Sequence, residues 1–385
     1  MGLITLLLGG ILFYFFLVPP LFDILVNRTR LRKPYKISAE ALALHDTLNV
    51  VDLHCDALIC NRDLLKRRSY GHVDIPRLVE GNVALQIFTI PTKTPVREGV
   101  PWIPTDLDAL TFQVVAQRWP LAAWTSTLQR ALFCAHRLQT VEANAAGKFR
   151  ILRTAQDLER YLENRKQDKT LTAGILGVEG LHCLEGKLEN LDVLFDAGIR
   201  LGGLVHLGGN EVGGAAHGRD SGGLTPFGES VIRRMEEKHI LIDLAHASTK
   251  LIDDVLNITT RPVVISHTGF KGVCDNERNL SDTHAKQIAA QGGVIGIGYF
   301  PWATGGKNVA SIIRTMMYGI DLVGSEHIAL GSDYDGAVTT PFDISGVALI
   351  TDALMQAGLD SEDIAKIMGG NALRLFRETL PADHK

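Results

Sequence analysis

The stretch Val51-Asp52-Leu53-His54-Cys55-Asp56 begins as an apolar run and ends on a histidine and an aspartate two residues apart. In a β-strand, residues i and i+2 point to the same face, so the His54 imidazole and the Asp56 carboxylate would converge there. Such a pair can supply half of a metal site. A single His-x-Asp pair is more often a local hydrogen-bonded contact, so its meaning depends on the ligands that the rest of the chain supplies.

Seven further apolar runs follow, separated by amphipathic stretches of helical length such as residues 226–238 and 309–322. The predicted strands cover residues 49–54, 83–90, 173–178, 201–205, 240–245, 262–266, 293–298 and 328–332. Short apolar strands that alternate with helices indicate parallel strands covered on both faces. Eight such units over roughly 300 residues predict an α/β fold of the (β/α)8 TIM-like barrel type. A doubly wound open sheet is the alternative.

Seven of the eight predicted strands end on a residue that can bind a metal or transfer a proton. These residues are His54 with Asp56, Glu179, His206, His246, His267, Tyr299 and Asp333. In a barrel, the C-terminal ends of the strands meet at one rim, which carries the active site. Each residue alone is compatible with a turn or a helix cap. Ligand-type residues gathered at one rim instead predict a metal site.

The residue types at the rim indicate which metal chemistry to expect. Four histidines and three carboxylates, without a thiolate pattern, suit a borderline ion such as zinc. They are too many for one tetrahedral ion that keeps an open position. A two-metal site bridged by a carboxylate and a water accommodates a set of this size, and the metals would lower the pKa of the bridging water and polarise an acyl carbonyl. The predicted reaction class is metal-assisted hydrolysis.

A series of motifs runs in a fixed order from about residue 45 to 380. They are Asp52-Leu53-His54-Cys55-Asp56, Gly177-Val178-Glu179-Gly180, Val205-His206-Leu207, Gly223-Leu224-Thr225-Pro226-Phe227-Gly228, Leu241-Ile242-Asp243-Leu244-Ala245-His246-Ala247-Ser248, Ile265-Ser266-His267 with Arg278-Asn279, Gly331-Ser332-Asp333-Tyr334-Asp335-Gly336, and Gly370-Asn371-Ala372-Leu373-Arg374-Leu375-Phe376. In these motifs and their order the chain resembles the membrane dipeptidases, which are renal dipeptidase-like zinc metallopeptidases. The resemblance implies a metal-dependent hydrolase barrel that cleaves dipeptides, with two zinc ions per chain, and a homodimer.

The resemblance also assigns the metal ligands. His54 and Asp56 would bind one zinc ion, His246 and His267 the other, and Glu179 would bridge the two.

Three further residues receive catalytic or binding roles by the same resemblance. His206 would bind the substrate and stabilise the tetrahedral oxyanion, a large catalytic term in a dry site. Arg278 would hold the terminal carboxylate of the substrate, a task that suits a planar bidentate donor. Asp333 would carry the proton from the bridging water to the leaving amine. Asp335 faces the same way by strand period, and only the resemblance selects Asp333.

One position departs from the family pattern. The family has a substrate-contacting tyrosine in the region of the seventh strand, whereas this chain reads Tyr299-Phe300, with the tyrosine one place earlier. A shift by one residue turns the tyrosine to the opposite face, so side-chain recognition is expected to differ. The glycine-rich loop 208–223 and the proline-rich loop 91–104 are further candidates for specificity.

Two other functions are compatible with parts of this pattern. Another binuclear amidohydrolase would act on small amides or lactones, but such barrels often bridge their metals with a modified lysine, and here Glu179 holds the bridging place. A non-catalytic, membrane-anchored peptide-binding protein would be expected to have lost a ligand, and no ligand is missing.

The N-terminus is predicted to be a membrane anchor. Residues 2–18 are uncharged and apolar, and a second apolar run follows Pro19-Pro20. This length is near the lower limit for a spanning helix. No basic region precedes the run and no small-x-small site follows it, which favours an uncleaved anchor over a signal peptide. The predicted parts are an anchor at 1–27, a linker with a short helix at 28–44, and the barrel at 45–380.

The charge and cysteine content indicate which partners and which location to expect. With 39 basic and 43 acidic residues and no long basic block, nucleic acid is not an expected partner. Five scattered cysteines form no disulfide framework or zinc finger, although a single disulfide is possible. The expected partners are a dipeptide and a membrane. Basic residues after the anchor favour a cytoplasmic barrel, but that rule is statistical and leaves the side of the membrane open.

Overall fold

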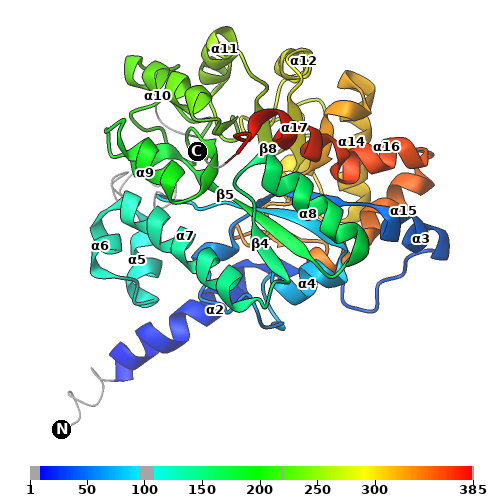
Figure 1. The fold of residues 1–385 in the computed structure, drawn as a ribbon, viewed down its shortest axis with the longest axis horizontal. Coiled ribbons are helices and arrows are strands. Elements are labelled where there is room, and N and C mark those ends of the chain that lie inside the picture. Colours follow the sequence, from blue (N-terminus) through cyan, green and yellow to red (C-terminus); the bar gives the residue numbers. More distant parts are fainter. Residues whose placement is uncertain (1–8, 95–107, 218–220, 384–385) are drawn as a thin grey trace.

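In the computed structural model, which describes residues 9–94, 108–217 and 221–383, eight parallel strands close into a barrel (Figure 1). The barrel strands are β2 (Val50–Cys55), β3 (Val83–Phe88), β5 (Thr172–Glu179), β6 (Ile199–Gly203), β7 (Leu241–Asp243), β8 (Val264–Thr268), β9 (Val294–Ile297) and β10 (Ile328–Leu330). The sheet closes because β2 pairs with β10 while β3 pairs with β5. The predicted (β/α)8 barrel is therefore confirmed, and the open-sheet alternative is wrong.

Helices surround the sheet, as Figure 1 shows. They include α3 (Ala39–Thr47), α4 (Ile75–Glu80), α5 (Ala109–Ala116), α6 (Leu121–Thr125), α7 (Thr127–Asn144), α8 (Ala155–Gln167), α9 (Asn190–Asp196), α10 (Pro226–Glu237), α11 (Thr249–Ile258), α12 (Asp282–Ala290), α13 (Pro301–Thr304), α14 (Val309–Val323), α15 (Ala348–Gln356), α16 (Ser361–Ala365) and α17 (Asn371–Thr379). Helices α5 and α6 are separate because Pro120, at the N-cap of α6, lacks the backbone donor that a continuous helix needs.

Side chains at the helix N-termini explain where several helices begin. The Ser38 hydroxyl accepts a hydrogen bond from the backbone N–H of Ala41. Thr154 and Asp157 form a reciprocal capping box at the start of α8. Both caps satisfy donors that have no partner within the helix.

Three short strands were not predicted. Strand β4 (Phe149–Ile151) extends the sheet beyond β5. Strand β1 (Arg28–Thr29) pairs in parallel with β11 (Thr339–Thr340). Strands of two or three residues carry too little periodicity to be recognised in a sequence. The β1–β11 pair matters for the site, because it attaches the N-terminal segment to the loop that follows β10.

The N-terminal segment is helical from Gly9 to Val26, and α2 (Val18–Val26) is its C-terminal part. In Figure 1 this helix projects from the body; its C-terminal end meets the barrel, and farther out the Tyr14 hydroxyl donates a hydrogen bond to the backbone oxygen of Phe112 in α5. Its length and hydropathy are sufficient to cross a membrane. Signal sequences and buried core helices can satisfy the same two criteria.

Candidate metal centre

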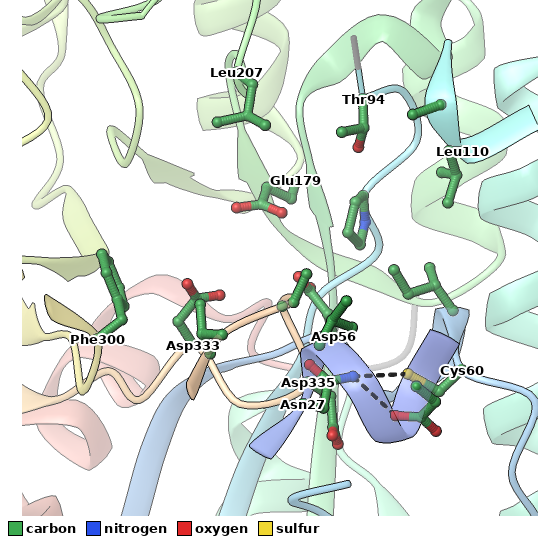
Figure 2. A pocket seen from close by; sticks show the side chains of 18 of the residues that line it. Asn27, Asp56, Cys60, Thr94, Leu110, Glu179, Leu207, Phe300, Asp333 and Asp335 are labelled. Carbon is green, nitrogen blue, oxygen red and sulfur yellow. Dashed lines mark hydrogen bonds between the residues drawn. The ribbon is translucent and has the colours of Figure 1, made fainter. Parts of the chain in front are cut away.

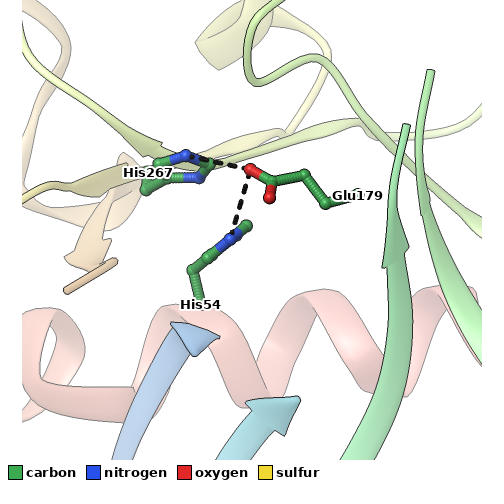
Figure 3. Close-up of side chains that lie close together, drawn as sticks. All are labelled: His54, Glu179 and His267. Carbon is green, nitrogen blue, oxygen red and sulfur yellow. Dashed lines mark ion pairs between the residues drawn. The ribbon is translucent and has the colours of Figure 1, made fainter. Parts of the chain in front are cut away.

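Glu179, the last residue of β5, has its carboxylate among four imidazoles. Its Oε1 lies 3.0 Å from Nε2 of His246, and 3.4 Å from Nε2 of both His54 and His267. Its Oε2 lies 3.3 Å from Nε2 of His206. Figure 3 shows one oxygen of the Glu179 carboxylate facing both His54 and His267, which come from β2 and β8. The carboxylate thus belongs to two groups of side chains that could each hold a metal ion, one with His54 and His267 and one with His206 and His246.

A second group of ligand atoms adjoins the first through His54. One side-chain atom each of His54, Asp56 and Asp333 lies within 4.8 Å of the other two. Asp56 follows β2 directly, and its Oδ1 accepts a hydrogen bond of 2.7 Å from the Thr89 hydroxyl. This bond fixes the carboxylate, since a hydrogen-bonded partner limits its rotation. His54 and Asp56 therefore converge as the strand geometry predicted.

The backbone at two of these residues is left-handed. His246 has φ of 64° and Asp333 has φ of 62°. Residues with a Cβ adopt this region at a cost of about 1–3 kcal/mol, and such residues concentrate at functional sites. The structure accepts this strain where it directs the two side chains into the centre.

Ser266 and Asp243 orient two of the histidines. The Ser266 hydroxyl lies 2.8 Å from Nδ1 of His54 and 2.9 Å from Nδ1 of His267. With Nδ1 engaged, each ring directs Nε2 toward Glu179. Asp243 in turn accepts hydrogen bonds from the backbone N–H groups of Ser266 and Ala245. Contacts of this kind fix the tautomer and orientation of metal-binding imidazoles.

The buried acids and imidazoles perturb one another strongly. Burial, with a contribution from Asp56, raises the pKa of Glu179 to about 8. Burial also raises the pKa of Asp333 well above its usual range. Burial and the Arg278 charge lower the pKa of His246 well below its ordinary value. Although burial lowers the pKa of His54, Glu179 and Asp56 raise it to about 10. Crowded buried carboxylates of this kind are what a divalent cation stabilises.

Two buried imidazole nitrogens without a hydrogen-bond partner are a second sign that these side chains fit a metal cofactor. Nε2 of His54 and Nδ1 of His246 are buried and make no hydrogen bond to the described residues. A buried nitrogen without a partner is costly, and a bound cation would satisfy the His54 atom where the ligand groups meet. The groups around Glu179 contain imidazoles and carboxylates but no cysteine. This combination suits zinc.

The centre opens into a pocket of about 670 Å³. Asp56, Glu179 and Asp333 point into it, and Phe300 stands at one side (Figure 2). His206, His246, His267 and Arg278 also line it. Arg278 is only 6% exposed, and its Nη2 donates a hydrogen bond of 2.6 Å to the backbone oxygen of His267. The pocket therefore combines the candidate metal-binding groups with the buried guanidinium of Arg278.

The structure distinguishes Asp333 from Asp335, and Phe300 from Tyr299. Asp335 is buried in an ion pair with Arg62, 2.6 Å from carboxylate to guanidinium, whereas Asp333 faces the ligand group. Tyr299 was grouped with the rim residues, and this is wrong: it is 1% exposed, and its ring meets the Tyr334 ring edge-on, with an interplanar angle of 89°. Phe300 lines the pocket instead. Strand β9 ends at Ile297, so the chain has left the strand before reaching Tyr299.

Comparison with known proteins identifies the family. The model of the family "Membrane dipeptidase (Peptidase family M19)" matches residues 38–385. The chain belongs to this family. It is therefore a metallo-dipeptidase, and the family implies a metal cofactor.

The relatives of this dipeptidase include fungal and mammalian proteins. Dipeptidase tcpJ of Claviceps purpurea is 25% identical over 343 residues, covering 87% of this chain and 75% of the relative. Dipeptidase 3 of Mus musculus is 26% identical over 367 residues, covering 89% of this chain and 67% of the relative. A metallo peptidase from Rhodobacter sphaeroides, solved with a phosphinate mimic of the dipeptide L-Ala-D-Ala, superposes with a TM-score of 0.71. That structure is 24% identical, and the match covers 86% of this chain and 99% of the other.

Several pocket residues of this dipeptidase were not singled out from the sequence. His217, in the predicted specificity loop 208–223, lines the pocket together with Trp302, whose ring centroid lies 5.8 Å away. Pro91 and Thr94 of the other predicted loop also line it, while residues 95–107 lie outside the described residues. The N-terminal helix contributes as well. Its apolar pattern signalled a helix but gave no sign of where that helix would lie.

Proposed function

We propose that this chain is a zinc dipeptidase with two zinc ions, held by His54 and Asp56 on one side and by His246 and His267 on the other. Glu179 would bridge the ions. The observation that carries the proposal is the position of the Glu179 carboxylate, with one oxygen within 3.4 Å of Nε2 of all three histidines. Bound there, the ions would acidify a water between them and polarise the peptide carbonyl.

The residues around the centre would then position the substrate and move its protons. Arg278 presents a buried guanidinium that can bind the free carboxylate of a dipeptide. Nδ1 of His206 lies 3.1 Å from the Lys93 carbonyl. A proton on Nδ1 would be donated to that carbonyl, and a proton on Nε2 would be available to an oxyanion. The two can be present together only on a charged ring, and burial lowers the His206 pKa to about 4. The proposed oxyanion role therefore requires the Nε2–H tautomer or a charge gained during the reaction.

Asp333 would serve as the proton carrier. Its pKa is raised by burial, so it can hold a proton taken from the attacking water and release it to the leaving amine. Asp335 cannot take this part, because Arg62 holds its carboxylate in an ion pair. Asp333 is thus the carboxylate available to the substrate.

The N-terminal helix supports a membrane-anchored form of the enzyme. We infer that residues 1–27 form the anchor, that 28–44 link it to the body, and that 45–380 form the barrel. The helix from Gly9 to Val26 is largely exposed outside its docked end, and Phe112, whose backbone oxygen accepts from the Tyr14 hydroxyl, is 58% exposed. Exposed apolar surface of this kind suits contact with lipid. A homodimer remains a prediction, measurable by sedimentation of the detergent-solubilised chain.

The test of the proposed function uses the full chain in detergent, loaded with zinc. It should hydrolyse members of a panel of L,L- and L,D-dipeptides that includes Gly-D-Ala, with metal content near two per chain. Asp333→Asn should abolish turnover while both metals stay bound. Asp321→Asn, an exposed aspartate on α14, is the matched control and should retain full activity. Failure of the loaded wild type to cleave any dipeptide would refute the proposal.

A further inference from the structure

The C-terminal end of the N-terminal helix forms part of the active-site pocket. Pro19, Phe22 and Val26 line it with apolar surface, and Asn27 follows at its edge. In Figure 2 the helix passes beside the pocket into which Asp56 and Asp333 point. A segment that ordinarily serves only to attach a protein to a membrane is here in reach of a bound substrate.

Buried polar contacts hold this segment in place. Asp23 pairs with Arg62 at 3.0 Å, and Arg62 pairs with Asp335 at 2.6 Å. The three side chains are 5%, 1% and 0% exposed. Asn27 donates to Asp23 at 2.9 Å and also contacts the Cys60 sulfur (Figure 2). Charges this deeply buried are stable only with their partners, so the helix end is built into the barrel.

Pro19, Phe22, Val26 and Asn27 form one wall of the pocket, and this wall precedes the part of the chain that the family model matches. The family match begins at residue 38, whereas the segment from Pro19 to Asn27 precedes it. The pocket therefore has a catalytic centre made by residues inside the family match and a side wall made by residues that precede it.

The wall lies across the pocket from the predicted carboxylate-binding group. Arg278 lies near Phe300, 6.0 Å from guanidinium carbon to ring centroid. Figure 2 places Phe300 on one side of Asp333 and Asp56, and Asn27 with Cys60 on the other. If Arg278 holds the C-terminal carboxylate, as in the proposed function on which this step rests, the N-terminal residue of the dipeptide points toward the wall.

We propose that Phe22 and Val26 of the N-terminal helix determine which N-terminal side chain the enzyme accepts, and that they favour an apolar one. Ile59 and Leu110 line the pocket together with them and extend the apolar surface. Apolar side chains gain by leaving water for such a surface, and one methylene changes kcat/KM by about tenfold or more. The segment Val18–Asn27 is thus a specificity element as well as an anchor.

The experiment compares kcat/KM for two substrate pairs, using the full zinc-loaded chain in detergent. Leu-D-Ala against Gly-D-Ala varies the N-terminal side chain, and Gly-D-Leu against Gly-D-Ala varies the C-terminal one. In Phe22→Ala and in Val26→Ala, the Leu-D-Ala to Gly-D-Ala ratio should fall by about tenfold, while the second ratio stays within twofold. Leu25→Ala, 57% exposed on the same helix, is the matched control and should change neither ratio.

A further variant acts on the attachment rather than on the wall surface. Asp23→Asn removes the charge that Arg62 holds and should lower the same N-terminal ratio by releasing the helix end. Unchanged ratios in Phe22→Ala and Val26→Ala, or a change confined to the C-terminal pair, would overturn the proposal and leave the dipeptidase assignment intact. A wild type that cleaves no dipeptide would instead overturn the assignment, and the specificity proposal with it.

Discussion

Replacing Arg62 with methionine tests how strongly the buried charges hold the N-terminal helix and the loop after β10 together. The guanidinium is 1% exposed and lies between two carboxylates, those of Asp23 and Asp335. Asp335 would keep hydrogen bonds from the backbone N–H groups of His72 and Val73, but neither carboxylate would keep its cation. Removing one partner of a buried ion pair costs about 3–5 kcal/mol.

The corresponding change in melting temperature follows from the size of the domain. With an unfolding entropy of about 2.1 cal/mol/K per residue, the 348 residues from 38 to 385 give about 0.7 kcal/mol/K. Arg62→Met should therefore lower Tm by about 4–7 °C, measured by calorimetry on zinc-loaded protein at a fixed scan rate.

A matched control separates this effect from the loss of any arginine. Arg233 pairs with Glu229 on the surface of α10, where the side chains are 68% and 49% exposed. Exposed pairs contribute about 0–1 kcal/mol, so Arg233→Met should lower Tm by less than about 1.5 °C. If the two variants melt within 1 °C of each other, Arg62 does not hold buried charges as the structure places them.

Three further predictions concern the metal centre and the response to acid. Glu179→Gln should reduce bound zinc below one ion per chain, because it weakens the ligand that both proposed sites share. Metal analysis of the purified variant measures this, and two bound ions per chain would contradict it. Removal of zinc with a chelator should abolish dipeptide hydrolysis, and readdition of zinc should restore it; activity that persists in demonstrably metal-free protein would refute the proposed chemistry. Although Asp335 is buried, Arg62 and a hydrogen bond from His72 lower its pKa below the ordinary value near 3.8. The folded state therefore holds this proton less tightly than the unfolded chain, so its contribution to stability is complete above about pH 4 and is lost as the pH falls further. Denaturation by acid should begin at higher pH in Arg62→Met than in the wild type.

The barrel could be predicted because its signals are local. Each strand is a short apolar run, each helix has its own periodicity, and the ligands stand where strands end, so one rule about barrels places them together. The same rule is enough to predict that His54, Glu179, His246 and His267 lie close together. This is why the candidate ligands and the barrel emerge from the same pattern.

The remaining features depend on contacts that no local pattern encodes. Arg62 pairs with Asp23 and Asp335, which are far from it in sequence, and nothing in the residues around it indicates either partner. Ser266 precedes a predicted ligand, yet its contact with His54 requires β2 and β8 to meet across the barrel. Tyr299 was misplaced because strand alternation was extended beyond Ile297, where β9 ends.

The loop after β10 places Asp333 at the candidate metal centre and Asp335 at the attachment of the N-terminal helix. Asp333 faces the candidate metal-binding group, while Asp335, two residues later, pairs with Arg62 and through it with Asp23 of the N-terminal helix. Both aspartates have left-handed backbone, with φ of 62° and 63°. The ion pairs at Asp335 can offset the cost of this conformation, so the docked helix helps to hold the loop that aims Asp333. A loosened helix should therefore reduce kcat as well as alter specificity.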